Sequence, residues 1–133
     1  MKQQLTIDGE YQASVYFIGA NTTSIQITTN MQESKFVTHS YVKSPALSEA
    51  AVFVSRGYFV DDDIDGNYRF HYIMEEDNSP TIIEPSKANF YLGMVGRVGL
   101  PLEEDITLLY HNDKISIFDM NRNNSVIMFS KKH

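Results

Sequence analysis

The chain has 133 residues, a formal net charge of -6 at pH 7 and no cysteine. A chain of this length suits one domain, so we expect a single domain over residues 1–133. The lack of cysteine excludes disulfides, thiolate metal sites and cysteine catalysis. No apolar run reaches the roughly 18 residues of a membrane helix, and no signal peptide is recognisable at the N-terminus. These features predict a soluble, cytoplasmic protein with no membrane partner.

The charge is unevenly distributed along the chain. Residues 49–119 carry nine more acidic than basic side chains, whereas the last fourteen residues carry three basic side chains and no acidic one. A strongly negative segment repels phosphate backbones and attracts cationic surfaces. Direct binding of nucleic acid is therefore not expected, and a protein with a basic surface is the expected partner.

Alternating apolar and polar residues predict strands in the N-terminal third of the chain. The pattern runs through residues 4–8, 11–18, 24–29 and 35–42. The Asp8-Gly9 pair between the first two segments predicts a tight turn with a positive φ at Gly9.

One helix is predicted to begin at Ser44 and to end before Gly57. Ser44 is a suitable N-cap and Pro45 suits the first helical position. The apolar residues that follow at helical spacing are Leu47, Ala50, Ala51 and Val54. The competing interpretation is that residues 52–54 already belong to a strand.

Further strand patterns follow at regular intervals towards the C-terminus. They cover residues 58–60, 67–74, 81–84, 89–98, 105–110, 114–119 and 125–130. The prolines around 81–84 indicate a short edge strand, and the glycines within 89–98 indicate bulges in a long one. The sequence therefore predicts a mainly β fold, an antiparallel barrel or sandwich of about ten short strands with one short helix.

Three clusters of acidic residues lie at predicted turns. They comprise Asp61, Asp62, Asp63 and Asp65; Glu75, Glu76 and Asp77; and Glu103, Glu104 and Asp105. Carboxylates next to turn residues stay hydrated, which makes them poor acid–base catalysts. These clusters are therefore interpreted as an acidic interaction surface rather than as an active site.

The first cluster also suggests a metal site. Asp61, Asp63 and Asp65 alternate ahead of Gly66, as the ligands of a Ca²⁺ loop do. The twelfth position of such a loop is Tyr72 instead of a bidentate glutamate, and strand patterns rather than helices flank it. A hydrated hairpin tip is the favoured interpretation, and Ca²⁺ is the only cofactor that the sequence suggests.

No spacing typical of a catalytic site is present, so we do not expect an enzyme. The favoured hypothesis is a small acidic protein–protein interaction module, an inhibitor or regulator of the kind that phages and mobile elements encode. It would present the acidic loops to a nucleic-acid-handling protein, with aromatic anchors at Tyr58, Tyr68 and Tyr110. The alternative is a β-barrel that binds Ca²⁺ or a small molecule. Its cavity would be lined by Phe17, Phe90, Phe118 or Met128.

Overall fold

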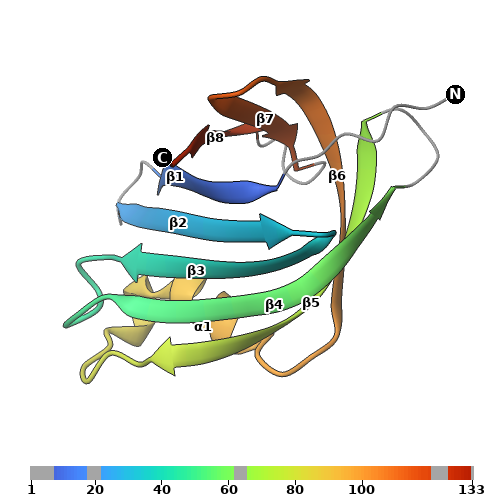
Figure 1. Cartoon of the computed structure of the whole chain (residues 1–133). Coiled ribbons are helices and arrows are strands. Elements are labelled where there is room, and N and C mark those ends of the chain that lie inside the picture. Colours follow the sequence, from blue (N-terminus) through green and yellow to red (C-terminus); the bar gives the residue numbers. More distant parts are fainter. Residues whose placement is uncertain (1–7, 18–21, 62–65, 121–125, 133) are drawn as a thin grey trace, which may run out of the picture.

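The structure, a computed structural model of the chain, describes residues 8–17, 22–61, 66–120 and 126–132. Within these residues eight antiparallel strands form a closed barrel, in which each strand pairs with its neighbours in the chain and β8 pairs with β1 (Figure 1). The strands are β1 (Gly9–Phe17), β2 (Thr23–Gln32), β3 (Lys35–Lys43), β4 (Ala51–Asp61), β5 (Asn67–Asn78), β6 (Leu102–His111), β7 (Ile115–Asp119) and β8 (Val126–Lys131). Between β5 and β6 lie a 3-10 turn, η1 (Pro85–Lys87), and one short helix, α1 (Asn89–Val95). The predicted mainly β, antiparallel fold with one short helix is confirmed.

The helix predicted from Ser44 is wrong. The Ser44 hydroxyl accepts a hydrogen bond from the Ala46 amide, and its carbonyl accepts one from Leu47, so the capping residues form only a turn. From Ala51 onwards the chain pairs with β3 on one side and β5 on the other. Two ladders of backbone hydrogen bonds, together with complete burial of Phe53, outweigh a weak local helix preference. The competing strand interpretation of residues 52–54 is the correct one.

The long strand predicted over residues 89–98 is also wrong, because this segment contains α1. Ala88, Tyr91 and Met94 recur at a spacing of three and pack on the core from one side of the helix. The edge strand predicted over 81–84 is reduced to an isolated bridge between Leu47 and Ile83. No helix in the described ranges combines the length and the hydropathy needed to cross a bilayer.

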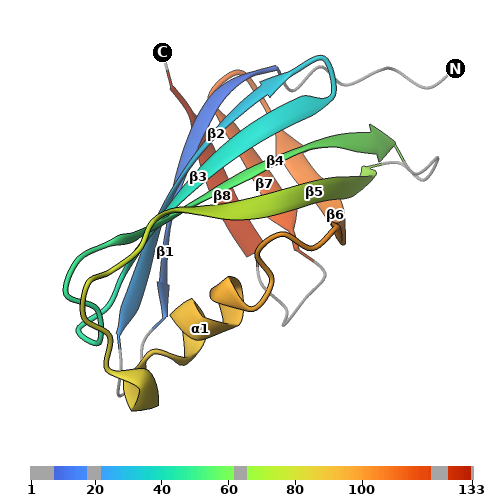
Figure 2. The same ribbon diagram turned by 90° about the horizontal axis from the view of Figure 1, so that it is seen from below.

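The core consists of two clusters of buried side chains. One lies where α1 packs across the end of the barrel (Figure 2), and it contains Ile25, Val42, Phe53, Met74, Ala88 and Tyr91. The other is largely aromatic, with Phe59 stacked on Phe70 at a ring-centroid distance of 5.1 Å and Phe36 edge-on to Phe70 at 5.3 Å. These two clusters position the interior site described below.

Two glycines have a clear conformational role. Gly9, the first residue of β1, adopts φ +135°, a positive value as predicted, whereas residues 4–7 of the strand predicted before it lie outside the described residues and leave the predicted turn untested. A Cβ atom at Gly57 would lie 1.8 Å from the carbonyl oxygen of His71. β4 and β5 therefore approach so closely at this position that only glycine fits.

Candidate ligand-binding site in the barrel interior

A cavity of about 220 Å³ lies inside the barrel, between the two core clusters. Its wall is mainly apolar and comes from strands β2 to β8, and α1 contributes Met94. The apolar lining includes Met31, Phe36, Phe70, Met74, Ile106 and Phe118. Alternation along each strand directs these side chains inwards, since every second residue of a barrel strand faces the interior.

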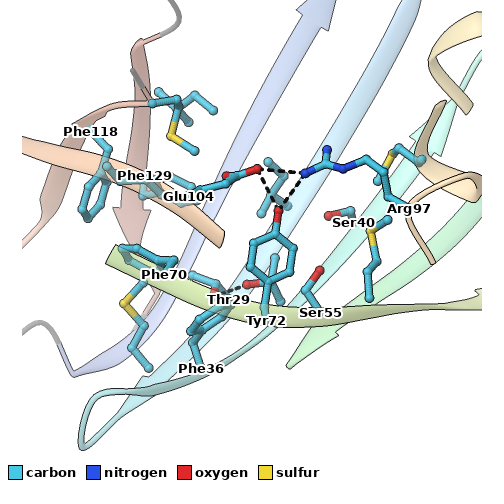
Figure 3. Close-up of a pocket in the computed structure, with 18 residues that line it drawn as sticks. Thr29, Phe36, Ser40, Ser55, Phe70, Tyr72, Arg97, Glu104, Phe118 and Phe129 are labelled. Carbon is cyan, nitrogen blue, oxygen red and sulfur yellow. Dashed lines mark hydrogen bonds and ion pairs between the residues drawn. The ribbon is translucent and has the colours of Figure 1, made fainter. Parts of the chain in front are cut away.

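Several polar side chains also face this cavity (Figure 3). On β2 and β3 the hydroxyls of Thr29 and Thr38 share a hydrogen bond of 2.6 Å. Ser40 on β3 and Ser55 on β4 place their hydroxyls in the same wall. Ser55 is only 9% exposed, and its hydroxyl makes no hydrogen bond with another described residue. A hydroxyl that faces the cavity in this way offers a donor and an acceptor to whatever occupies it.

The most polar part of the lining is a hydrogen-bonded group of Tyr72, Arg97 and Glu104, which we call the Arg97 cluster. Nη2 of Arg97 donates to Oε1 of Glu104 at 3.1 Å and to the hydroxyl oxygen of Tyr72 at 3.2 Å. The Tyr72 hydroxyl donates to the same Glu104 oxygen at 2.8 Å. Figure 3 shows the three side chains closing a triangle of hydrogen bonds.

The three members of the Arg97 cluster come from adjoining parts of the fold. Tyr72 on β5 pairs with Leu102 on β6, two residues before Glu104, so their side chains emerge on the same face. Arg97 lies in the turn after α1, where its amide donates to the carbonyl of Met94. The Glu104 side chain is 19% exposed and that of Arg97 is 36% exposed, so both charges are partly withdrawn from water. Ion pairs of this kind gain from charge-assisted hydrogen bonds.

Glu104 was predicted to belong to an acidic surface, whereas the structure turns it towards the cavity. Its neighbours Glu103 and Asp105 lie outside the barrel wall, where both pair with the Nε atom of Arg69, at 3.1 and 3.0 Å. Residues 103–105 thus lie within β6 rather than at the predicted turn, and Arg69 and Arg97 largely neutralise the negative patch predicted there.

The acidic residues of β5 differ from one another in their surroundings. Glu75 lies 3.8 Å from Arg56, and both side chains are well exposed. Oε2 of Glu76 accepts a hydrogen bond of 2.6 Å from the Tyr91 hydroxyl. Burial, and secondarily Glu76, raises the pKa of Tyr91 to about 12. Asp77 is exposed, so at most part of this cluster is available to a partner.

The predicted Ca²⁺ loop lies mostly outside the described residues. Asp61 is exposed at the end of β4, whereas Asp62, Asp63 and Asp65 fall in the gap before Gly66. In the part of the chain that the structure describes, no group of three or more His, Cys, Asp or Glu side chains is arranged to hold a metal ion. The metal prediction therefore stays a prediction.

The predicted aromatic anchors separate into two classes. Tyr58 and Tyr110 are exposed, and Tyr58 stacks on His71 at a ring-centroid distance of 4.9 Å. Tyr68 is 8% exposed and packs edge-on against Phe59 in the core. Tyr68 is therefore not available as a surface anchor, because its position on β5 directs it into the barrel.

Of the residues expected to line a cavity, only Phe118 does so. Met128 is exposed on the outer face of β8, and Phe17 contacts Phe90 of α1 at 5.2 Å, where both rings remain partly exposed. The sequence reasoning missed Arg97, which it placed in a bulged strand. Arg97 is the only charged residue between Lys87 and Glu103, and this isolation within an apolar segment is the signal that could have identified it.

No protein-family model matches the chain, and no curated protein resembles its sequence significantly. The interior site is therefore interpreted from its own geometry and chemistry.

Proposed function

We propose that the protein binds a small, largely apolar molecule inside the barrel. The observation that carries this proposal is the cavity of about 220 Å³, with its apolar wall and a few polar groups. Eight-stranded barrels are either filled by their own side chains or hold one small ligand. A concave, mostly apolar interior with a few fixed polar groups is typical of small-molecule sites.

The size of the cavity limits the size of the ligand. An apolar protein cavity of about 150 Å³ binds benzene, so a proportionate ligand here has roughly nine non-hydrogen atoms. Apolar ligand surface leaves water on entry and contributes about 25 cal/mol per Å². A ligand of this size therefore gains affinity from the apolar wall and is oriented by the polar groups.

The test compares two neighbouring residues of β8. Ile127 lines the cavity, whereas Met128 is exposed on the outer face. Ile127→Phe places a bulkier aromatic side chain towards the interior and fills part of the cavity. Met128→Phe places the same aromatic side chain on the outer face. Indole at about ten times its Kd stabilises a binding-competent fold by about 1.4 kcal/mol, which raises the melting temperature by a few degrees. We expect this rise for the wild type and for Met128→Phe, and its loss in Ile127→Phe.

Calorimetric or NMR titration with indole and toluene checks the same result without heating. If neither probe changes the melting temperature or the spectrum of the wild-type protein, the proposed function is wrong. Equal binding by the wild type and by Ile127→Phe would place the ligand outside this cavity and contradict the proposal as well.

The acidic interaction module is retained as a second proposal, with a role as inhibitor or regulator of a basic protein. The exposure of Tyr58, Tyr110 and Asp77 supports it. The pairing of Glu103 and Asp105 with Arg69 reduces the negative charge available to a partner. The interior cavity is the more specific feature, and we rank ligand binding first for that reason.

A further inference from the structure

We infer that the ligand carries an uncharged hydrogen-bonding group, such as a carboxamide or a hydroxyl, which it places against the Arg97 cluster. This inference rests on the proposed function and specifies the chemical class of its ligand. It predicts discrimination against carboxylates and against amidinium or ammonium ions of the same shape.

The described lining of the cavity carries no net charge. Arg97 and Glu104 are the only charged side chains among the described residues around the cavity, and they pair with each other at 3.1 Å. Their formal charges cancel, and Tyr72 bonds to both. The described part of the wall therefore presents a local dipole to an occupant rather than a net charge.

Binding a charged occupant costs free energy in this cavity. A carboxylate that approaches Arg97 also approaches the Glu104 carboxylate, which already accepts from Arg97 Nη2. An amidinium or ammonium ion that approaches Glu104 meets Arg97 in the same way. Either ion gives up its hydration shell to enter a mainly apolar cavity and leaves the site with an unbalanced charge. A neutral group avoids both costs.

The cavity wall also supplies hydrogen-bonding groups suited to a neutral polar ligand. A guanidinium group has five N–H donors, and the Arg97 bonds described above use only Nη2. Ser55 adds a hydroxyl without a described partner, on a side chain that is nine-tenths buried. Ser40 adds another hydroxyl to the wall. A carbonyl oxygen suits the arginine donors, and an N–H or O–H group suits a serine oxygen.

Three nearly isosteric probes test the inference. Benzamide is neutral, benzoate is an anion and benzamidine is a cation at pH 7, and all three match the cavity in size. We expect the wild-type protein to bind benzamide about tenfold or more tightly than either ion, measured by calorimetric or NMR titration. This comparison needs no variant. Equal or tighter binding of benzoate or benzamidine by the wild type would overturn the inference.

A substitution in the Arg97 cluster gives a second, independent measurement. Glu104→Gln keeps the size and the acceptor oxygen of the side chain but removes the negative charge that balances Arg97. We expect the affinity for benzoate to rise about tenfold or more while the affinity for benzamide changes little. Glu103→Gln is the matched control, because Glu103 lies next in the chain and pairs with Arg69 outside the barrel. It should leave all three affinities unchanged.

The outcomes separate the two proposals. If indole and toluene bind and benzamide, benzoate and benzamidine show no preference by charge, the inference fails and the proposed function stands. If indole, toluene and all three probes fail to bind, both are wrong. An unchanged benzoate affinity in folded Glu104→Gln, verified by circular dichroism, would also overturn the inference.

Discussion

Tyr91 joins α1 to β5 through one short hydrogen bond. Its ring is 5% exposed and lies 5.9 Å from the ring of Phe53, measured between centroids. Its hydroxyl donates to Oε2 of Glu76 at 2.6 Å. Burial disfavours the tyrosinate, and the neighbouring carboxylate adds to this effect, so the pKa of Tyr91 rises to about 12. This hydrogen bond adds to the packing of Ala88, Tyr91 and Met94 that holds the helix across one end of the barrel.

The raised pKa predicts a specific dependence of stability on pH. Because the pKa in the folded protein exceeds the ordinary tyrosine value of 10.0, the folded state holds this proton more tightly than the unfolded chain does. The resulting stabilisation, on the order of 2 kcal/mol, is complete below pH 10 and is lost as the pH rises through about 12. Glu76→Gln lowers the pKa of Tyr91 and reduces this loss.

Tyrosine absorbance titration measures the pKa directly, and urea unfolding at pH 9 and pH 11 measures the loss of stability. Glu75→Gln is the control, because Glu75 pairs with Arg56 on the exposed side of β5. The same pH-dependent loss in the wild type and in Glu76→Gln would show that Glu76 has no such role.

At the scale of elements, the hairpin between β2 and β3 contains the two non-glycine residues with a positive φ in the described part of the chain. Glu33 and Ser34 form its two-residue turn, with φ values of 52° and 66°. Positive φ at both central residues defines a type I′ turn, for which Asn-Gly is the preferred sequence. Here the turn is held by the strands on either side, whose register pairs Met31 with Phe36 and Ile25 with Val42. All four of these side chains are buried.

Ser34→Gly is therefore expected to stabilise the protein. Glycine adopts a positive φ without the clash of a Cβ atom, and the expected gain in unfolding free energy is about 1 kcal/mol. Ser34→Ala is the control, since it removes the hydroxyl and keeps the Cβ atom. Urea denaturation measures both variants, and an equal change in the two would contradict the interpretation of strain.

At the scale of the whole molecule, the chain carries a net charge of -6, and described charged side chains such as Arg69, Glu103 and Asp105 lie outside the wall of the closed barrel. Arg69 lies against Glu103 and Asp105, and Arg56 lies near Glu75, so local pairing divides the negative surface into smaller patches. Long-range attraction to a cationic partner depends on the total charge and is screened by salt beyond about 10 Å at 0.1 M.

The acidic interaction proposal therefore predicts a strong salt dependence. Binding to polylysine, a probe for a basic surface, should weaken about tenfold or more between roughly 0.05 and 0.5 M salt. At a fixed salt concentration, Asp77→Asn should bind polylysine more weakly than the wild type does, because Asp77 is exposed. Glu104→Gln should weaken this binding less, because Glu104 faces Arg97 in the interior. Binding that is independent of salt would remove the electrostatic basis of this proposal.

The local pattern of the sequence was enough to predict most of the strands. The alternation in residues 105–110 and 114–119 predicted the hairpin of β6 and β7, in which Leu108 pairs with Phe118. The same reasoning found β3 and most of β2. It succeeded because a strand with one buried face has a period of two, which is visible without knowledge of its neighbours.

Local pattern failed where two preferences competed. Residues 51–54 suit a helix or a strand, and pairing with β3 and β5 selects the strand. Gly93 and Gly96 within residues 89–98 suggested a bulged strand, yet burial of Ala88 and Tyr91 against the barrel end selects the helix α1. Contacts with residues distant in the sequence decide such cases, and periodicity carries no information about them.

The sequence by itself thus determined a β-rich, cysteine-free chain with an excess of negative charge. Only the tertiary structure decided that the sheet closes around a cavity and that Arg97 and Glu104 neutralise each other within it. Tyr72 and Glu104 are 32 residues apart and become neighbours through the pairing of β5 with β6. A local sequence pattern indicates which face of a strand is buried. The set of residues that line the barrel interior depends instead on how all the strands pair with one another.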